Sequence, residues 1–196
     1  MFKRTRRPMG GLGVFVLMLA LAPSVLAITS WFPHSVSWGF QGTGPSTSPP
    51  SGHNICYNVH RAQVGWQGWK CDGQVAGGST SYSIEAIAVV TWIVEAQGHI
   101  QGIGWTNHLF GWTPSGNKWG TTGQARRLEG LAIETPDGVG HGAGTLCGNS
   151  YVQGIGWQTY HCVKGQTGSG PHGISTFGTW GQGKAMYSIY MTVTWS

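Results

Sequence analysis

Glu85 and Glu129 are the side chains best suited to acid–base catalysis, because a glycosidase needs two carboxyl groups on either side of its substrate. They occupy the same position in two copies of an internal repeat, and Tyr187 takes that position in the third copy. A residue that recurs by repetition can serve each copy separately. We therefore expect each glutamate to make a structural hydrogen bond, and we predict no catalytic residue in this chain.

Histidine side chains could bind a metal ion, and two of the eight, His60 and His99, share a repeat position with Tyr151 in the third copy. The H-x₃-H and H-E-x-x-H spacings of common metal sites are absent. The sequence also lacks a phosphate-binding glycine loop and the G-x-S-x-G turn of a nucleophilic serine. We expect no metal site, no cofactor and no enzymatic activity.

All four cysteines lie in two matched segments, CYNVHRAQVGWQGWKC and CGNSYVQGIGWQTYHC, which begin at Cys56 and Cys147. If each segment is a β-hairpin with a two-residue turn at its midpoint, Gly154-Ile155 in the second, its cysteines are directly opposed and can be bridged. Four cysteines allow three pairings, and a four-thiolate zinc site is the alternative, although it would normally need C-x₂₋₄-C pairs. The repeat register predicts the disulfides Cys56–Cys71 and Cys147–Cys162.

Alignment on Gly-Trp gives three copies of a unit made of two blocks. The first block ends in AQVGW, HIQGIGW or YVQGIGW, and its last residue is Trp66, Trp105 or Trp157. The second block spans residues 79–89, 123–133 and 181–191. Because a tryptophan buries a large apolar area and needs only one partner for its N–H, we expect the three shared tryptophans to be structural core residues.

These blocks resemble the clostridial hydrophobic W (ChW) repeat, found in secreted bacterial proteins, in which an HVQ-x-x-GWQ stretch precedes a TGQ-x-x-RLE-x-I-x-I stretch. The middle copy is the most similar, through HIQGIGW and TTGQARRLEGLAI, and the resemblance extends over residues 56–195. The first copy lacks the GQ and the Arg, the third lacks the Glu, and paired cysteines are not part of the family pattern. The resemblance implies secretion, a repeat architecture and a role in surface interactions.

The composition favours β-structure over helix. The 196 residues include 34 Gly and 11 Trp, only 9% are charged, and short apolar stretches alternate with Gly, Thr and Ser. Each copy is too small to bury its own apolar face, so the three copies should share one core. We predict an all-β domain of three pseudo-repeats over residues 54–196, with a β-prism-like fold; a β-trefoil is the alternative.

Residues 1–27 have the pattern of a secretory signal peptide, with basic residues, the apolar run GVFVLMLALA and small residues ending at Ala27. That run is too short to span a membrane, so we expect a secreted protein with no membrane span after cleavage. General and twin-arginine export both stay open. Residues 28–53 are an N-terminal segment followed by a linker rich in Pro, Gly and Ser.

The net charge argues against nucleic acid as a partner. Four of the eleven Lys and Arg lie in residues 1–27, which leaves seven against six acidic residues, a net charge of +1. The remaining cations are scattered apart from one Arg-Arg pair, whereas nucleic-acid binding needs a cluster of them.

Three residues after each shared tryptophan stands another ring: Trp69, His108 or Tyr160. On a regular strand an offset of three places two side chains on opposite faces, so these rings should face solvent if the tryptophans face the core. Exposed rings can stack on the apolar C–H face of a sugar. We predict a secreted, non-catalytic module that binds cell-wall or environmental polysaccharide through these rings, and an extracellular protein–protein interaction scaffold is the alternative.

Overall fold

The computed structural model of the chain describes residues 40–78, 80–91, 95–106, 109–110, 116–134, 137–138, 142–165 and 173–195. All of them belong to one compact unit, residues 32–196. The predicted signal peptide and residues 28–39 lie outside the described residues. Within the described ranges the regular structure is β-strand, which confirms the all-β prediction, and no helix there could cross a membrane.

Each repeat consists of a β-hairpin followed by a longer strand that pairs with it. The first repeat has β2 (Ile55–Arg61), β3 (Gly65–Trp66), β4 (Lys70–Cys71) and β6 (Ile84–Thr91). The second repeat has β7 (Glu95–Ile100), β8 (Gly104–Trp105), β9 (Leu109–Phe110) and β11 (Leu128–Glu134). The third repeat has β13 (Gly142–Val152), β14 (Gly156–Trp157), β15 (His161–Lys164) and β17 (Met186–Trp195). The sequence repeat is therefore also a structural repeat.

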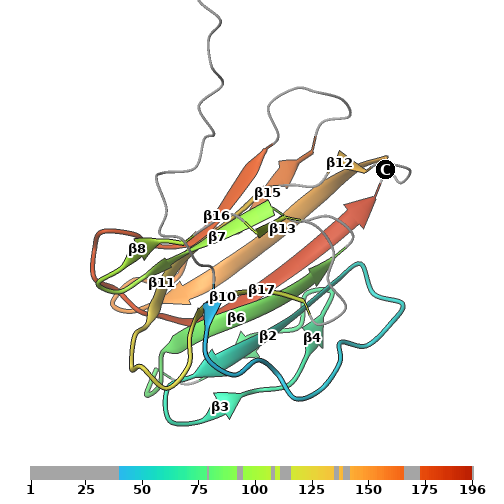
Figure 1. The fold of residues 1–196 in the computed structure, drawn as a ribbon. Helices are drawn as coiled ribbons and strands as arrows, with labels where there is room; N and C mark the ends of the chain where they lie inside the picture. The colour runs from blue at the N-terminus through green and yellow to red at the C-terminus, as the bar shows by residue number, and fades with distance from the viewer. Residues whose placement is uncertain are drawn as a thin grey trace, which may run out of the picture. The chain divides into compact units, whose positions relative to one another are not determined.

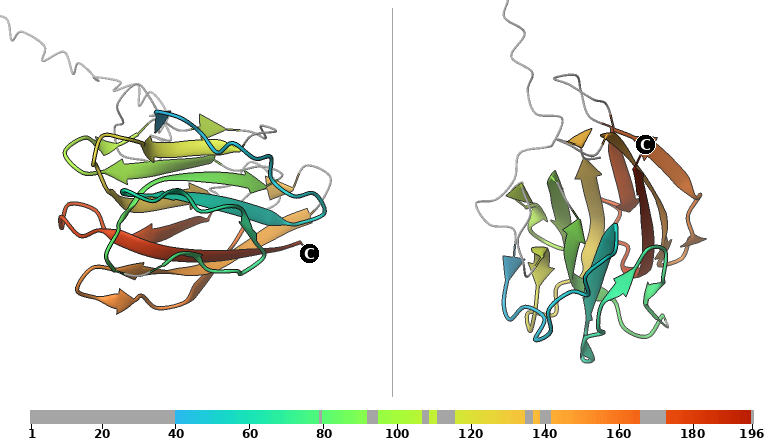
Figure 2. Two further views of the ribbon diagram at one scale, coloured as in Figure 1. Left: turned by 90° about the horizontal axis from the view of Figure 1, so that it is seen from below. Right: turned by 90° about the vertical axis from the view of Figure 1, so that its right-hand side faces the viewer.

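Between its hairpin and its longer strand, each repeat gives a short strand to the sheet of another repeat. These strands are β5 (Ala76–Gly77), β10 (Asn117–Thr121) and β16 (Ile174–Gly178). β10 pairs with β6 of the first repeat, β16 with β11 of the second, and β5 with β17 of the third. The exchange is cyclic: the second repeat gives a strand to the first, the third to the second and the first to the third. It produces three sheets, and each contains strands of two repeats (Figures 1 and 2). The finer assignment to a β-prism or a β-trefoil stays a prediction.

Two further short strands extend these sheets at their edges. β1 (Phe40–Gln41) runs parallel to β10, and β12 (Asp137–Gly138) pairs with β13. β1 belongs to the predicted N-terminal segment, so the described part of that segment is attached to the first sheet.

Each longer strand has a register shift, a β-bulge, at the aligned position of the second block, Glu85, Glu129 or Tyr187. The exchanged strand passes each bulge with a glycine at positive φ: Gly120 beside Glu85, Gly178 beside Glu129 and Gly77 beside Tyr187. A Cβ atom on these glycines would lie 2.2 or 2.3 Å from the carbonyl oxygen of the bulged residue. Only glycine lets the exchanged strand approach so closely.

The hairpin registers place Cys56 opposite Cys71 and Cys147 opposite Cys162, and both pairs form disulfides as predicted. The second repeat has Glu95 opposite Phe110 at the corresponding place. The disulfides therefore reinforce the two hairpins in which the cysteines face each other across paired strands.

The predicted two-residue turn is wrong. Arg61 pairs with Gly65, so the loop between them has three residues, and Gln63 in its middle has a φ of 61°. Gly102 and Gly154 take the same left-handed conformation in the other hairpins, with φ of 72° and 68°. The cysteines are still opposed because the stretch that follows each return strand is irregular and shifts the register by one residue.

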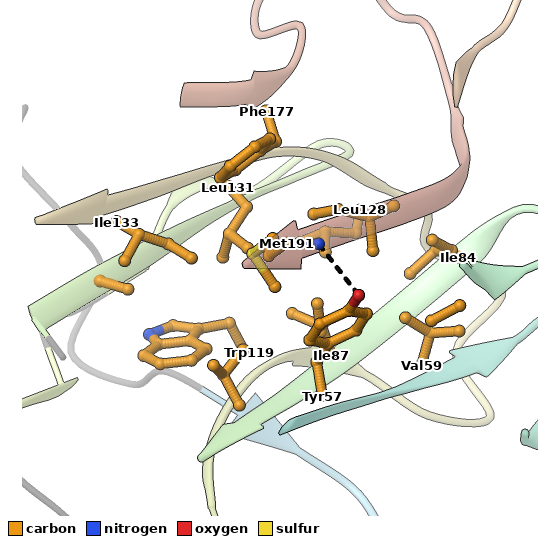
Figure 3. Close-up of a cluster of buried hydrophobic side chains, with 14 of the residues drawn as sticks. Tyr57, Val59, Ile84, Ile87, Trp119, Leu128, Leu131, Ile133, Phe177 and Met191 are labelled. Atoms are coloured by element: carbon orange, nitrogen blue, oxygen red, sulfur yellow. Dashed lines mark hydrogen bonds between the residues drawn. The ribbon is translucent and has the colours of Figure 1, made fainter. Parts of the chain in front are cut away.

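One buried apolar cluster receives residues from all three sheets (Figure 3). Trp119 and Phe177, which precede the crossing glycine in β10 and β16, are fully buried, and Ala76 holds this place in β5. The Tyr57 hydroxyl accepts a hydrogen bond from the backbone N–H of Met191 at 2.9 Å (Figure 3). Burial raises the pKa of Tyr57 to about 12 because the charged phenolate would lose its hydration.

The shared tryptophans Trp66, Trp105 and Trp157 lie outside this core, and the prediction that they form it is wrong. Trp66 is paired with His60, and directly opposed residues project from the same face of a sheet. Val59, the neighbour of His60, points into the core, so His60 and Trp66 point outward. Repetition of a tryptophan therefore marks a repeated outer face here.

The close approach of β10 to β6 predicts unequal costs for two similar substitutions. Gly120→Ala and Gly123→Ala both place alanine at positive φ, but only Gly120 has backbone atoms against the new Cβ, while Gly123 has none within 4 Å. Each variant loses roughly 1–3 kcal/mol from its φ, with the larger loss at Gly120, whose φ of 113° lies farther from the left-handed region, and Gly120→Ala should lose roughly 1–3 kcal/mol more by overpacking. Denaturant unfolding measures the difference, and equal losses would contradict the role of Gly120.

Candidate functional site

The outer side of each hairpin carries a pair of rings in an edge-to-face arrangement. Ring centroids lie 5.4 Å apart for His60–Trp66, 5.3 Å for His99–Trp105 and 5.6 Å for Tyr151–Trp157, with interplanar angles of 76°, 78° and 83°. Such geometry is favourable for aromatic pairs. The three repeats thus present the same ring pair on their outer faces.

In the first two repeats the side chain of the bulged residue, Glu85 or Glu129, points toward the histidine ring of this pair. Nδ1 of His60 lies 3.2 Å from Oε2 of Glu85, and Nδ1 of His99 lies 3.2 Å from Oε2 of Glu129. Both glutamates are only 4% exposed. Each carboxylate is thus buried and engaged within its own repeat, which supports a structural role. Both contacts lie at ion-pair distance and are not well-aligned hydrogen bonds.

Burial controls the protonation of these groups. It lowers the pKa of His60 and raises that of Glu85, because the charged form of each loses hydration. Burial also lowers the pKa of His99, and the nearby Glu129 carboxylate opposes that shift only in part. Glu129 has a second partner, since Nε of Arg127 donates a hydrogen bond to its Oε1 at 3.2 Å.

The three outer tryptophans differ in what covers them. Phe40 packs on Trp66 with a centroid distance of 6.3 Å, and Trp180 packs on Trp105 at 5.5 Å. Trp157 remains 45% exposed. The third repeat therefore presents the most open of the three equivalent faces among the described residues.

On this open side the rings of the third repeat form a continuous series, which we call the third-repeat aromatic face and define as Tyr151, Trp157, Tyr160 and Tyr190. Trp157 packs edge-on to Tyr190 at 5.7 Å, and Tyr160 stacks on Tyr190 at 5.9 Å with an interplanar angle of 13°. Tyr160 is 50% exposed. The face is a solvent-accessible surface of neutral rings.

The three predicted ligand-binding residues differ in their surroundings. Tyr160 belongs to the exposed face. The N–H of Trp69 donates a hydrogen bond to the carbonyl of Thr47 at 2.9 Å, so its own chain partly covers this ring. His108 lies outside the described residues. The expectation that Tyr160 faces away from Trp157 is wrong, because both contact Tyr190 and the stretch between them is not regular strand.

Sequence reasoning missed Tyr190, which links the two exposed rings. The signal was present in the last strand, where Ile189, Met191 and Val193 alternate with Tyr190 and Thr192. That period of two places the apolar residues in the core and Tyr190 on the outer face. Reading this alternation would have placed a ring beside the shared tryptophan.

A pocket of about 550 Å³ opens beside the same stretch of chain. Its lining includes Gln158, Thr159, His161, Thr176, Trp180 and Gln182. The Gln158 amide is fixed by Gly178, whose backbone N–H donates to Oε1 at 2.9 Å and whose carbonyl accepts from Nε2 at 3.0 Å. The pocket combines hydrogen-bonding groups with a tryptophan ring. Across the described ranges no group of three or more His, Cys, Asp or Glu is placed to hold a metal ion.

The buried histidines predict a loss of stability in mild acid. Because the folded state lowers the pKa of His60 and His99 below 6.5, the unfolded chain binds more protons as the pH falls through that value. The free energy of unfolding therefore falls with pH in this window. Thermal melts at about pH 7.5 and 5.5 should show a smaller decrease in the His60→Gln/His99→Gln variant than in the wild type. Equal decreases of the melting temperature in the two proteins would contradict this assignment, because the raised pKa of Glu85 contributes to the pH dependence of both proteins.

Comparison with known families agrees with the repeat boundaries of the structure. Residues 60–90 and 99–135 match the family model described as Clostridial hydrophobic W (ChW). Each match begins at the histidine of a ring pair, His60 or His99. It ends within one residue of the end of the longer strand of that repeat. No curated protein and no solved structure matches the chain. The first two of the three repeats therefore match the clostridial hydrophobic W family model.

Proposed function

We propose that this protein is a secreted, non-catalytic binding module that holds a polysaccharide on its third-repeat aromatic face. The observation that carries the proposal is the exposure of Trp157 and Tyr160, 45% and 50%, on a series of neutral rings joined by Tyr190. The C–H face of a sugar is apolar and stacks on such rings, while its hydroxyls stay hydrated. Exposed rings without a charged centre suit a neutral, extended ligand.

The neighbouring pocket supports a saccharide ligand through its hydrogen-bonding chemistry. Thr159 and Gln182 offer a hydroxyl and an amide group, and Trp180 supplies a ring with 46% of its surface exposed. Ligand sites commonly combine an apolar surface with a few placed polar groups. A polysaccharide bound on the aromatic face would extend its hydroxyls toward such groups.

Secretion is part of the proposal. The pattern of residues 1–27 predicts a signal peptide. The two disulfides and the ChW matches are in keeping with an extracellular protein, because disulfides persist in oxidising compartments. Cell-wall or environmental polysaccharide would be accessible there.

A protein–protein interaction scaffold is the second candidate, and one observation favours it. On the first repeat, the counterpart of the open face is covered by polypeptide, with the carbonyls of Thr43 and Thr47 accepting hydrogen bonds from Trp66 and Trp69. The aromatic face of a ChW repeat can thus accommodate an extended peptide. Under this candidate the open face of the third repeat would receive a segment of another protein.

Removal of the exposed rings tests the favoured function. Trp157→Ala and Tyr160→Ala should each raise the apparent Kd for an insoluble polysaccharide about 2- to 12-fold, as expected for one ring stack of about 0.5–1.5 kcal/mol. The panel consists of peptidoglycan, chitin and cellulose, and the fraction of protein retained by each polymer is measured. Retention should change little with salt, because the predicted mature chain has a net charge of only +1.

The matched control is Tyr82→Ala, which removes a ring that is 36% exposed and lies in the first repeat. It should leave retention unchanged, and Tyr160→Ala and Tyr82→Ala should keep melting temperatures near that of the wild type. Trp157→Ala loses its ring contacts with Tyr151 and Tyr190, so it should melt lower but still fold. If the wild type is retained by none of the three polymers but is cross-linked to a surface protein in culture, the polysaccharide proposal fails and the scaffold takes its place.

A further inference from the structure

The first repeat has an aromatic pair equivalent to the open face of the third repeat, and its own chain covers it. We call residues 40–50 the N-terminal strap. The N–H of Trp66 donates a hydrogen bond to the carbonyl of Thr43 at 2.8 Å, and the N–H of Trp69 donates to that of Thr47 at 2.9 Å. Phe40 packs on the Trp66 ring. The strap thus engages both rings at once.

The strand register fixes the equivalence of the two faces. Trp66 pairs with His60 in the first repeat as Trp157 pairs with Tyr151 in the third. Trp69 and Tyr160 follow these tryptophans by three residues. The strap therefore covers the counterparts of Trp157 and Tyr160, and its carbonyls satisfy the two indole N–H groups that a bound sugar could otherwise use.

The strap is held by few contacts. No residue from 40 to 54 is buried. Its strand pairing is limited to Phe40 and Gln41 beside Gly120 and Thr121. Beyond this pairing, the backbone N–H of Thr43 donates to Oγ1 of Thr122 at 3.0 Å, and Gln41 accepts two hydrogen bonds at 2.9 Å, from the backbone N–H of Thr122 and from Nε2 of Gln124. Segments with few buried apolar contacts open at low free energy while the rest of the fold remains intact.

We infer that Trp66 and Trp69 form a second polysaccharide-binding site, which the N-terminal strap closes. This inference rests on the proposed function of the third-repeat aromatic face. In the closed state the third-repeat aromatic face is open and the rings of the first repeat are covered. When the strap lifts, the protein gains a further face with two tryptophan rings. Two linked sites would then act together on one polymer and raise the avidity.

Gly42→Val is the variant that lifts the strap. Gly42 has a φ of +123°, and a Cβ there would lie 1.9 Å from Oγ1 of Thr122 and 3.1 Å from its backbone nitrogen. At both glycines the positive φ strains a valine, but only at Gly42 does the new side chain also collide with Thr122, so only Gly42→Val should displace the strap. Gly52→Val is the matched control, because Gly52 also has positive φ but has nothing within 4 Å of its Cβ position.

Both changes are made in the full chain and also in the Trp157→Ala/Tyr160→Ala background, in which the open face is disabled. Gly42→Val should increase acrylamide quenching of tryptophan fluorescence, and in the disabled background it should raise retention by peptidoglycan, chitin or cellulose about 2- to 12-fold. Gly52→Val should change neither quantity. If Gly42→Val leaves the quenching unchanged, a chain lacking residues 40–50 is measured in the same way.

The outcomes separate the inference from the proposal on which it rests. One outcome is that the wild type is retained, that quenching shows the strap displaced by Gly42→Val, and that retention in the disabled background does not increase. This outcome overturns the second site and leaves the proposed function intact. No gain from the chain lacking residues 40–50 has the same meaning. Retention of neither the wild type nor Gly42→Val by any of the three polymers overturns both.

Discussion

The fold depends on three close approaches between a glycine and a bulge. Gly120, Gly178 and Gly77 each bring an exchanged strand against the carbonyl of a bulged residue in another repeat, where any side chain would collide. Because the exchange runs from second to first, third to second and first to third repeat, each sheet needs two repeats. The same strands carry Trp119 and Phe177 into the shared core, so the crossing links sheet completion to core packing.

The bulge also shapes the outer faces. It aims Glu85 and Glu129 at the histidine rings that support the outer tryptophans. In the third repeat the bulged residue is Tyr187, whose ring centroid lies 6.4 Å from that of Tyr151. The ring beside Trp157 is therefore supported by an aromatic, uncharged side chain. The common frame therefore presents three similar ring pairs whose surroundings differ: a strap covers the first, Trp180 packs on the second, and the third is open. This difference of cover is the basis of the proposed function.

Much of this organisation could be predicted from the sequence. The repeat alignment gave the hairpins, the opposed cysteines and the shared position of the glutamates, because these follow from spacing. The core tryptophan could not be identified that way: Trp119 occurs in a five-residue strand, and Phe177 and Ala76 replace it in the other repeats. Trp66, Trp105 and Trp157 were misplaced because a repeated tryptophan can mark an outer face as well as a core. Tyr190 needed the period of two in the last strand, and the strap needed long-range contacts that no local pattern encodes.

The most direct test of the account follows the indole N–H signals of the ¹⁵N-labelled protein by NMR during titration with soluble fragments of peptidoglycan, chitin and cellulose. Trp157 is half exposed on the face proposed to bind, whereas Trp119 is fully buried in the core. The account predicts that at least one saccharide shifts the Trp157 signal progressively with concentration while the Trp119 signal stays in place. A Trp157 signal that stays fixed at saturating concentrations of all three, or that moves only together with Trp119 as the fold changes, would contradict it.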